Sequence, residues 1–107
     1  MPYLRIFGPD QVAREEDLTA DRMVIGRHPD AGIQLIDPSV SREHAVIEKT
    51  GESHKIIDNG SRSGIWINGE RIESAILEHG NSVQITRFVL EYRTDDASRS
   101  TDGPEAP

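Results

Sequence analysis

The stretch Ile65-Trp66-Ile67-Asn68-Gly69-Glu70-Arg71-Ile72 carries the strongest structural signal in this 107-residue chain. Apolar side chains alternate on both sides of Asn68-Gly69, and a period of two is typical of a half-buried strand. Asn and Gly tolerate the positive φ angles that a two-residue hairpin turn requires. The stretch therefore predicts two short antiparallel strands joined by a tight turn.

Other short apolar segments lie before and after this hairpin, separated by turn residues. They are residues 3–7, 22–25, 33–36, 45–48, 55–57, 83–85 and 88–92. The chain has 18 Ile and Val against 5 Leu, and β-branched side chains favour strands. Residues 12–18, whose charges are bunched, are expected to form a loop or a strand edge. The pattern predicts an all-β domain, either an antiparallel sandwich or a barrel.

Composition excludes several classes of protein. The formal charge is −7, with 12 Lys and Arg against 19 Asp and Glu, which disfavours a general nucleic-acid binder because phosphate backbones require basic surface. The absence of cysteine excludes disulfides, thiolate metal sites and cysteine nucleophiles. No apolar run is long enough for a membrane span or a secretory signal. We therefore expect a cytoplasmic protein without a membrane partner.

The last residues differ from the rest of the chain. After Tyr92 the sequence contains no Ile, Leu, Val or aromatic residue, so little apolar burial could offset the entropy lost on ordering. We expect one domain over residues 1–93, followed at 94–107 by a disordered acidic tail or linker.

Three polar loops carry the residues that turn formation alone does not explain: a first loop at 26–29, a second at 37–44 and a third at 58–64. Each contributes an arginine, and the second and third also contribute hydroxyl groups. Guanidinium and hydroxyl donors suit a dianionic phosphate, because several charge-assisted hydrogen bonds can converge on its oxygens.

The order of these motifs resembles the forkhead-associated (FHA) domain family over about residues 3–92. The matching segments are Gly26-Arg27, Ser41-Arg42-Glu43-His44, Asp58-Asn59-Gly60-Ser61, Gly64-Ile65-Trp66-Ile67-Asn68-Gly69 and Leu77-Glu78-His79-Gly80-Asn81-Ser82-Val83-Gln84-Ile85. The resemblance implies an antiparallel β-sandwich that binds phosphothreonine through loops at one end. The implied partners are phosphothreonine-containing proteins, kinase substrates among them, and the domain is expected to be a monomer.

The resemblance also implies roles for single residues. Arg27 and Ser41 match the principal phosphate contacts of the family, and Arg42 matches a position that often adds a second basic contact. Arg62 and Ser63 lie where the third loop meets the peptide backbone.

Four further positions match residues that shape the loops from within. They are Gly26, His44, Gly64 and Asn68. A histidine on the inner side of such a loop is expected to hold the loop by hydrogen bonds instead of touching the ligand.

One departure from the family pattern affects the peptide contacts. The third loop of the family normally carries Asn where this chain has Ser63. Serine has a shorter side chain with a single donor. We therefore expect the phosphate contacts to be intact and the hydrogen bonds to the peptide backbone to be weaker. The alternative interpretation is therefore an FHA-like interaction module that acts independently of phosphorylation.

Catalysis and metal binding are disfavoured. Ser41, His44 and Asp58 supply the residue types of a hydrolase, but the first two already belong to the family motif, and no strand-to-helix nucleophile turn is present. The histidines, at positions 28, 44, 54 and 79, match no common metal-ligand spacing. We expect a non-enzymatic protein that has no metal or cofactor.

Overall fold

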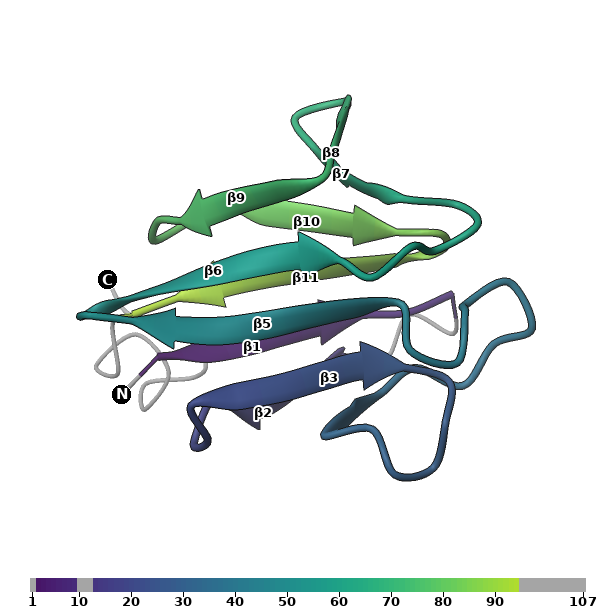
Figure 1. The fold of residues 1–107 in the computed structure, drawn as a ribbon, viewed down its shortest axis with the longest axis horizontal. Coiled ribbons are helices and arrows are strands. Elements are labelled where there is room, and N and C mark those ends of the chain that lie inside the picture. The colour runs from purple at the N-terminus through teal and green to yellow at the C-terminus, as the bar shows by residue number, and fades with distance from the viewer. Residues whose placement is uncertain (1, 10–12, 95–107) are drawn as a thin grey trace.

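Two β-sheets packed face to face make up the protein in a computed structural model, which describes residues 2–9 and 13–94 (Figure 1). This architecture confirms the predicted β-sandwich. The tail expected at 94–107 lies, apart from Thr94, outside the described residues. The domain boundary after residue 93 stays a prediction, although the last described strand ends at Arg93.

The first sheet has six strands in the order β2-β1-β11-β10-β7-β8. Their bounds are Ala13–Asp17 (β2), Tyr3–Phe7 (β1), Phe88–Arg93 (β11), Ser82–Ile85 (β10), Ile65–Ile67 (β7) and Glu70–Ile72 (β8). All neighbours in this sheet are antiparallel. The first and last strands of the chain are direct neighbours, and Tyr3 is the partner of Arg93 in their register.

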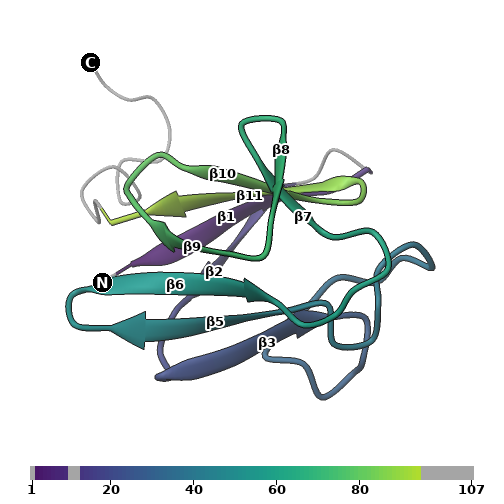
Figure 2. The same cartoon turned by 45° about the horizontal axis from the view of Figure 1, so that its top comes forward.

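The second sheet has five strands in the order β4-β3-β5-β6-β9. Their bounds are Ile33–Gln34 (β4), Arg22–Gly26 (β3), Ala45–Thr50 (β5), Ser53–Asp58 (β6) and Ser74–Leu77 (β9). Figure 2 shows β3, β5 and β6 as one layer that covers the layer containing β1, β10 and β11. β4 is parallel to β3, which differs from the wholly antiparallel arrangement expected.

The hairpin predicted at residues 65–72 is confirmed. Its turn residues adopt positive φ, 54° at Asn68 and 81° at Gly69, as a turn matched to twisted strands requires. Trp66 and Arg71 are direct cross-strand partners on either side of this turn.

Two segments differ from their predicted form. The segment 33–36 is a strand only over Ile33–Gln34, and Ile36 is 75% exposed. The pairing with β3 ends with the hydrogen bond from Leu35 N–H to the Gly26 carbonyl, 2.8 Å away, and a turn starts at Asp37. Strand β9 was not predicted, because its four residues lack an alternating pattern.

The core lies between the inner faces of the two sheets. Aliphatic side chains that are at most 2% exposed form it: Leu4, Ile6, Ile25, Ile33, Leu35, Val40, Ala45, Ile47, Ile56, Ile65, Leu77, Val83, Ile85 and Leu90. Burying each large side chain contributes about 1.5–3 kcal/mol, so the sandwich is a rigid base for the loops. Within the described ranges no helix has the length and apolarity needed to cross a membrane.

Candidate functional site

The three polar loops meet at the end of the sandwich on the right of Figure 1. Arg27 N–H donates to the Ser41 carbonyl (3.0 Å) and His28 N–H to the Arg42 carbonyl (3.2 Å), which joins the first loop to the second. Asn59 N–H donates to the carbonyl of His44 (3.0 Å), which joins the third loop to the second. Backbone hydrogen bonds therefore hold the second loop between the other two.

Gly26 permits this close approach of the first two loops. A Cβ atom at position 26 would lie 2.0 Å from the carbonyl oxygen of Arg42, and 2.7 Å from its carbonyl carbon. Both atoms belong to the backbone and have no side-chain freedom with which to move aside. The space between the loops accordingly requires glycine at this position.

The imidazole of His44 is fully buried and ties the second loop to the third. Its Nδ1 accepts the backbone N–H of Ser41 (3.1 Å), and its Nε2 lies 2.8 Å from the carbonyl of Gly64. Because Nδ1 accepts, the proton of the neutral ring sits on Nε2 and is donated to Gly64. This geometry is that of a histidine that shapes the loops from within.

The third loop is closed by hydrogen bonds between its own residues. The Ser61 hydroxyl donates to the Asp58 carboxylate and accepts the backbone N–H of Gly64 (2.8 Å). Gly64 has φ 78°, a left-handed conformation that glycine adopts without steric cost. A Cβ there would also meet the Arg71 side chain, 2.4 Å from its Nε.

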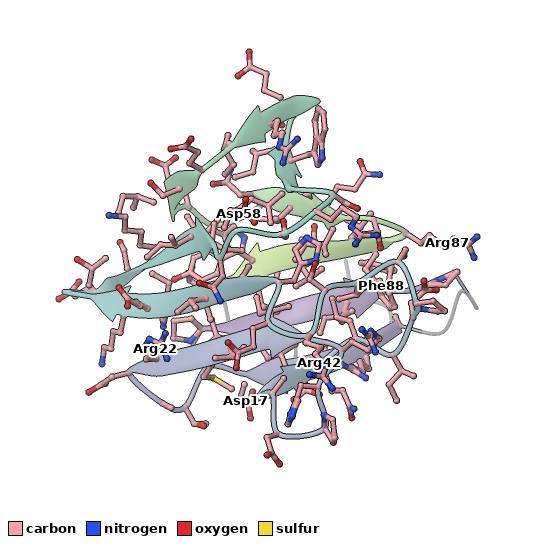
Figure 3. All side chains as sticks on the ribbon, turned by 45° about the vertical axis from the view of Figure 1, so that its right-hand side comes forward. Asp17, Arg22, Arg42, Asp58, Arg87 and Phe88 are labelled. Atoms are coloured by element: carbon pink, nitrogen blue, oxygen red, sulfur yellow. The ribbon has the colours of Figure 1, made fainter. Side chains whose placement is uncertain are left out.

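A pocket of about 300 Å³ opens between the first, second and third loops. It is lined by Arg27, Pro38, Ser39, Val40, Ser41, Arg42 and Arg62. Three of these are arginines and none is acidic, in a chain whose formal charge is −7. Arg42 lies on the side of the molecule that is turned forward in Figure 3. The pocket is thus a local concentration of positive charge.

Two hydrogen bonds fix the donors of this pocket. Arg27 Nε donates to the carbonyl of Val40 (3.0 Å), and its two terminal nitrogens have no protein partner among the described residues. The Ser41 hydroxyl accepts the backbone N–H of Arg62 (3.4 Å), which leaves its own proton available for donation. The arrangement presents guanidinium and hydroxyl donors to one small anion.

The second loop begins with a turn built on Asp37. Its carboxylate accepts the hydroxyl of Ser39 (2.6 Å) and the backbone N–H of the same residue (2.9 Å). These hydrogen bonds, the hydroxyl first, lower the pKa of Asp37, and the charge of Arg87 adds to the effect. The carboxylate is therefore occupied in the turn.

Of the residues predicted for the site, Arg27, Ser41, Arg42 and Arg62 come together around the pocket, while Ser63 lies outside its lining. The Ser63 carbonyl accepts Trp66 Nε1–H at 3.0 Å, so the backbone of Ser63 is held against β7.

Sequence reasoning missed three pocket residues: Pro38, Ser39 and Val40. The segment Asp37-Pro38-Ser39 is a recognisable turn signal that could have placed Ser39. Val40 acts through its carbonyl, which every residue possesses, so no sequence signal marks it.

The residue types of a hydrolase are present without the corresponding arrangement. His44 Nδ1 bonds the backbone N–H of Ser41, and Asp58 bonds Ser61 instead of His44. Across the described residues, no three His, Cys, Asp or Glu side chains form a metal-ligand group.

Solved structures of known domains share this fold. The FhaA FHA domain, solved in complex with the intracellular domain of another protein, has a TM-score of 0.79 at 26% identity, covering 87% of this chain and all of that one. Mycobacterium tuberculosis EmbR, solved with a low-affinity phosphopeptide, has a TM-score of 0.76 at 30% identity, covering 85% of this chain and 24% of that one.

Sequence comparison gives the same relationship. The glycogen accumulation regulator GarA of Mycolicibacterium smegmatis is 42% identical over 73 residues, which are 68% of this chain and 46% of that protein. The chain thus spans about half the length of this curated relative. The family model described as the FHA domain matches residues 23–86, which contain all three loops and the hairpin. The chain belongs to the FHA domain family.

Proposed function

We propose that this FHA domain binds phosphothreonine-containing segments of other proteins and catalyses no reaction of its own. The observation that carries the proposal is the pocket: Arg27, Arg42 and Arg62 surround it together with Ser41, and no carboxylate lines it. A monoanionic side chain would leave most of these donors unused, whereas a phosphate dianion offers three strong acceptor oxygens. The solved complex of EmbR with a phosphopeptide supports phosphopeptides as the ligand class.

In this proposal Arg27 and Ser41 are the principal phosphate contacts. The bond from Arg27 Nε to Val40 holds the guanidinium in place before the ligand arrives. This reduces the side-chain entropy that is lost on binding. Arg42 and Arg62 add charge from the second and third loops, and Ser63 contacts the peptide backbone.

The proposed partners are cytoplasmic proteins phosphorylated by Ser/Thr kinases, and the domain binds them as a monomer. A relative named as a regulator, GarA, supports a regulatory role. Recognition of phosphate by arginine clusters is a recurring mode among peptide-binding domains.

Calorimetry with a phosphothreonine peptide selected from an oriented library tests the proposal. Removing a charge-assisted contact costs about 1.5–3 kcal/mol, roughly a ten- to a hundredfold loss of affinity. We expect such a loss for Arg27→Ala. The matched control is Arg22→Ala, because Arg22 is an exposed arginine at the start of β3, the strand that leads into the first loop, and is paired with Glu48 at 3.6 Å. Equal binding of the unphosphorylated peptide would disprove the proposal.

A second candidate is binding that does not depend on phosphorylation. It is favoured by Ser63, whose hydroxyl makes no hydrogen bond to another described residue and lies outside the pocket lining. A partner that binds wild-type protein and Arg27→Ala with the same affinity, phosphorylated or not, would support this candidate.

A further inference from the structure

One row of side chains crosses the entire outer face of the six-stranded sheet. Its members are direct cross-strand partners in the order Ala13, Phe7, Val89, Gln84, Trp66 and Arg71, one from each of the strands β2, β1, β11, β10, β7 and β8. We call these six residues the outer row. Partners in register lie on the same face of a sheet, so the six side chains form one continuous line.

The outer row is exposed along its whole length. It holds three of the five large apolar side chains that are exposed in the described part of the protein. Phe7 is 40% exposed, and Val89 and Trp66 are each 36% exposed. Scattered exposed apolar residues are ordinary, but a row that gathers three of them, with only Gln84 between Val89 and Trp66, marks a candidate interaction surface.

The neighbouring row on the same face has a different composition. It contains Arg5, which is the partner of both Glu15 and Glu91 in the register. Arg5 and Glu15 are joined by an ion pair of 3.1 Å, and Glu91 is paired with Arg93 at 3.3 Å. The charges of that row are therefore compensated within the sheet, whereas Arg71 of the outer row has no ion-pair partner among the described residues.

The outer row is continuous with the pocket end of the domain. Trp66 Nε1 donates to the carbonyl of Ser63 in the third loop, at 3.0 Å. The Arg71 side chain covers Gly64 of the same loop, where a Cβ would lie 2.4 Å from its Nε. A ligand that leaves the third loop would thus reach Trp66 and Arg71 first.

The turn between β10 and β11 makes a second connection. The pair Gln84–Val89 is next to the pair Ile85–Phe88, which closes this turn. Arg87 projects from the turn at the right of Figure 3, and its charge acts on Asp37 of the second loop. The row and the phosphate pocket therefore share one end of the sandwich.

We propose that the outer row binds the extended segment that flanks the phosphothreonine in the partner protein. The segment would place an acidic side chain opposite Arg71 and apolar side chains along Trp66, Val89 and Phe7. The inference rests on the proposed function, because the phosphothreonine anchors the segment in the pocket. It adds a contact surface that lies outside the loops.

The dimensions suit a short peptide. From Arg71 to Phe7 the row crosses four gaps between neighbouring strands of about 4.8 Å each, roughly 19 Å in all. An extended chain advances about 3.3 Å per residue, so about six residues cover this length. Once the phosphothreonine is bound, the flanking segment is held close to the row, so its local concentration there is high. Even modest apolar contacts then add measurable affinity.

A peptide library tests the inference. Phosphothreonine is fixed within a short core, eight randomised residues are added on each side, and sequences bound by the wild-type domain are selected. We expect one flank to become enriched in apolar residues with an acidic residue near the core. The best extended peptide should bind about tenfold more tightly than its core, measured by fluorescence anisotropy.

Substitutions separate the row from the pocket. The double variant Phe7→Glu/Val89→Glu should abolish the tenfold gain and leave the affinity for the core peptide unchanged. Arg71→Gln should abolish the preference for the acidic residue. The matched control is Ile76→Glu, because Ile76 is 52% exposed and belongs to β9 in the other sheet. This control should leave both affinities unchanged.

Three results would overturn the inference. They are flanks that show no enrichment, a gain that persists in the double variant, and self-association of the wild-type domain that Phe7→Glu/Val89→Glu abolishes in sedimentation. The last result would assign the row to a second copy of the chain. Failure of the proposed function has a different signature, since the core peptide would then bind equally well without its phosphate.

Discussion

The carbonyl oxygen of Gly64 lies 2.8 Å from Nε2 of His44, 20 positions earlier in the chain. Through this bond one buried ring positions both a residue of the second loop, Ser41, and the backbone of the third loop. The distance between the two loops therefore depends on the size and polarity of a side chain that does not line the pocket.

His44→Phe keeps a planar ring and removes both hydrogen bonds. The Ser41 N–H and the Gly64 carbonyl lose their partner, at a cost of about 1–3 kcal/mol for each buried group. We expect the free energy of unfolding to fall by about 2–6 kcal/mol for the two groups together in urea denaturation. Phosphopeptide binding should also weaken. His79→Phe is the control, because His79 is exposed. A fully stable His44→Phe protein would show that other contacts position the loops.

Gly26→Ala inserts a methyl group between the first two loops. Its Cβ would lie 2.0 Å from the carbonyl oxygen of Arg42, so the loops must separate. Overpacking of this kind costs about 1–3 kcal/mol, and thermal unfolding should show the loss. Gly32→Ala is the comparison, because the nearest neighbour of its Cβ would be the end of the flexible Met23 side chain, at 3.3 Å. Similar melting of both variants would contradict this account.

Ser63→Asn restores the residue that the family normally carries in the third loop. Its amide would offer one donor and one acceptor to the peptide backbone, and each net hydrogen bond contributes about 0.5–1.5 kcal/mol. We expect affinity to rise about three- to tenfold across a series of phosphopeptides, whatever their side chains. Ser74→Asn, on the exposed part of β9, should change nothing. Unchanged or weaker binding would mean that the loop is remodelled for a particular partner.

The stability of the protein should depend on pH through His54. This side chain is 3% exposed, its Nδ1 is 2.8 Å from the Tyr92 hydroxyl, and burial followed by the charge of Lys49 lowers its pKa below 6.5. The same burial raises the pKa of Tyr92, which stays a neutral phenol. Below pH 6.5 the unfolded chain therefore binds a proton that the folded His54 does not.

The free energy of unfolding should accordingly fall as the pH decreases from 7.5 to 5.5, by at most about 1.4 kcal/mol per pH unit for this single group. Urea denaturation at several pH values measures it. His54→Phe should flatten the dependence in this window, whereas His79→Gln should not. If the slope is the same in His54→Phe, another group is responsible.

Much of the sandwich could be predicted because burial leaves a period of two in the sequence. Strands with apolar inner faces, such as β1, β5 and β11, were identified within two residues of their ends. The edge strand β2, Ala-Arg-Glu-Glu-Asp, has no buried face, so its sequence shows no alternation of apolar and polar residues. Contacts to β1, such as the Arg5–Glu15 ion pair, hold this strand in the sheet. Charged edge strands of this kind resist unwanted pairing with other chains.

The candidate site was predictable where chemistry depends on side chains. The three loops could be picked out because guanidinium and hydroxyl groups suit phosphate, and the resemblance to the FHA family then pointed to Arg27 and Ser41 within them. The backbone carbonyl of Val40 and the Trp66–Ser63 bond could not, because such partnerships depend on the distance between loops. The alignment of Trp66 with Phe7 likewise follows from the register of four strands, which no single segment encodes.

The pairing of Tyr3 with Arg93 brings the start of the first strand beside the end of the last, at the end of the sandwich opposite the pocket (Figure 1). Partners in an antiparallel pair have Cα atoms about 5 Å apart, so a linker of a few residues would join them. New chain termini could then be made elsewhere, for example at Gly51 in the β5–β6 turn, without disturbing the pocket. For the same reason, a group attached near Tyr3 or Arg93 would leave the pocket accessible. Such a group could be a fluorophore, a second binding domain or a solid support.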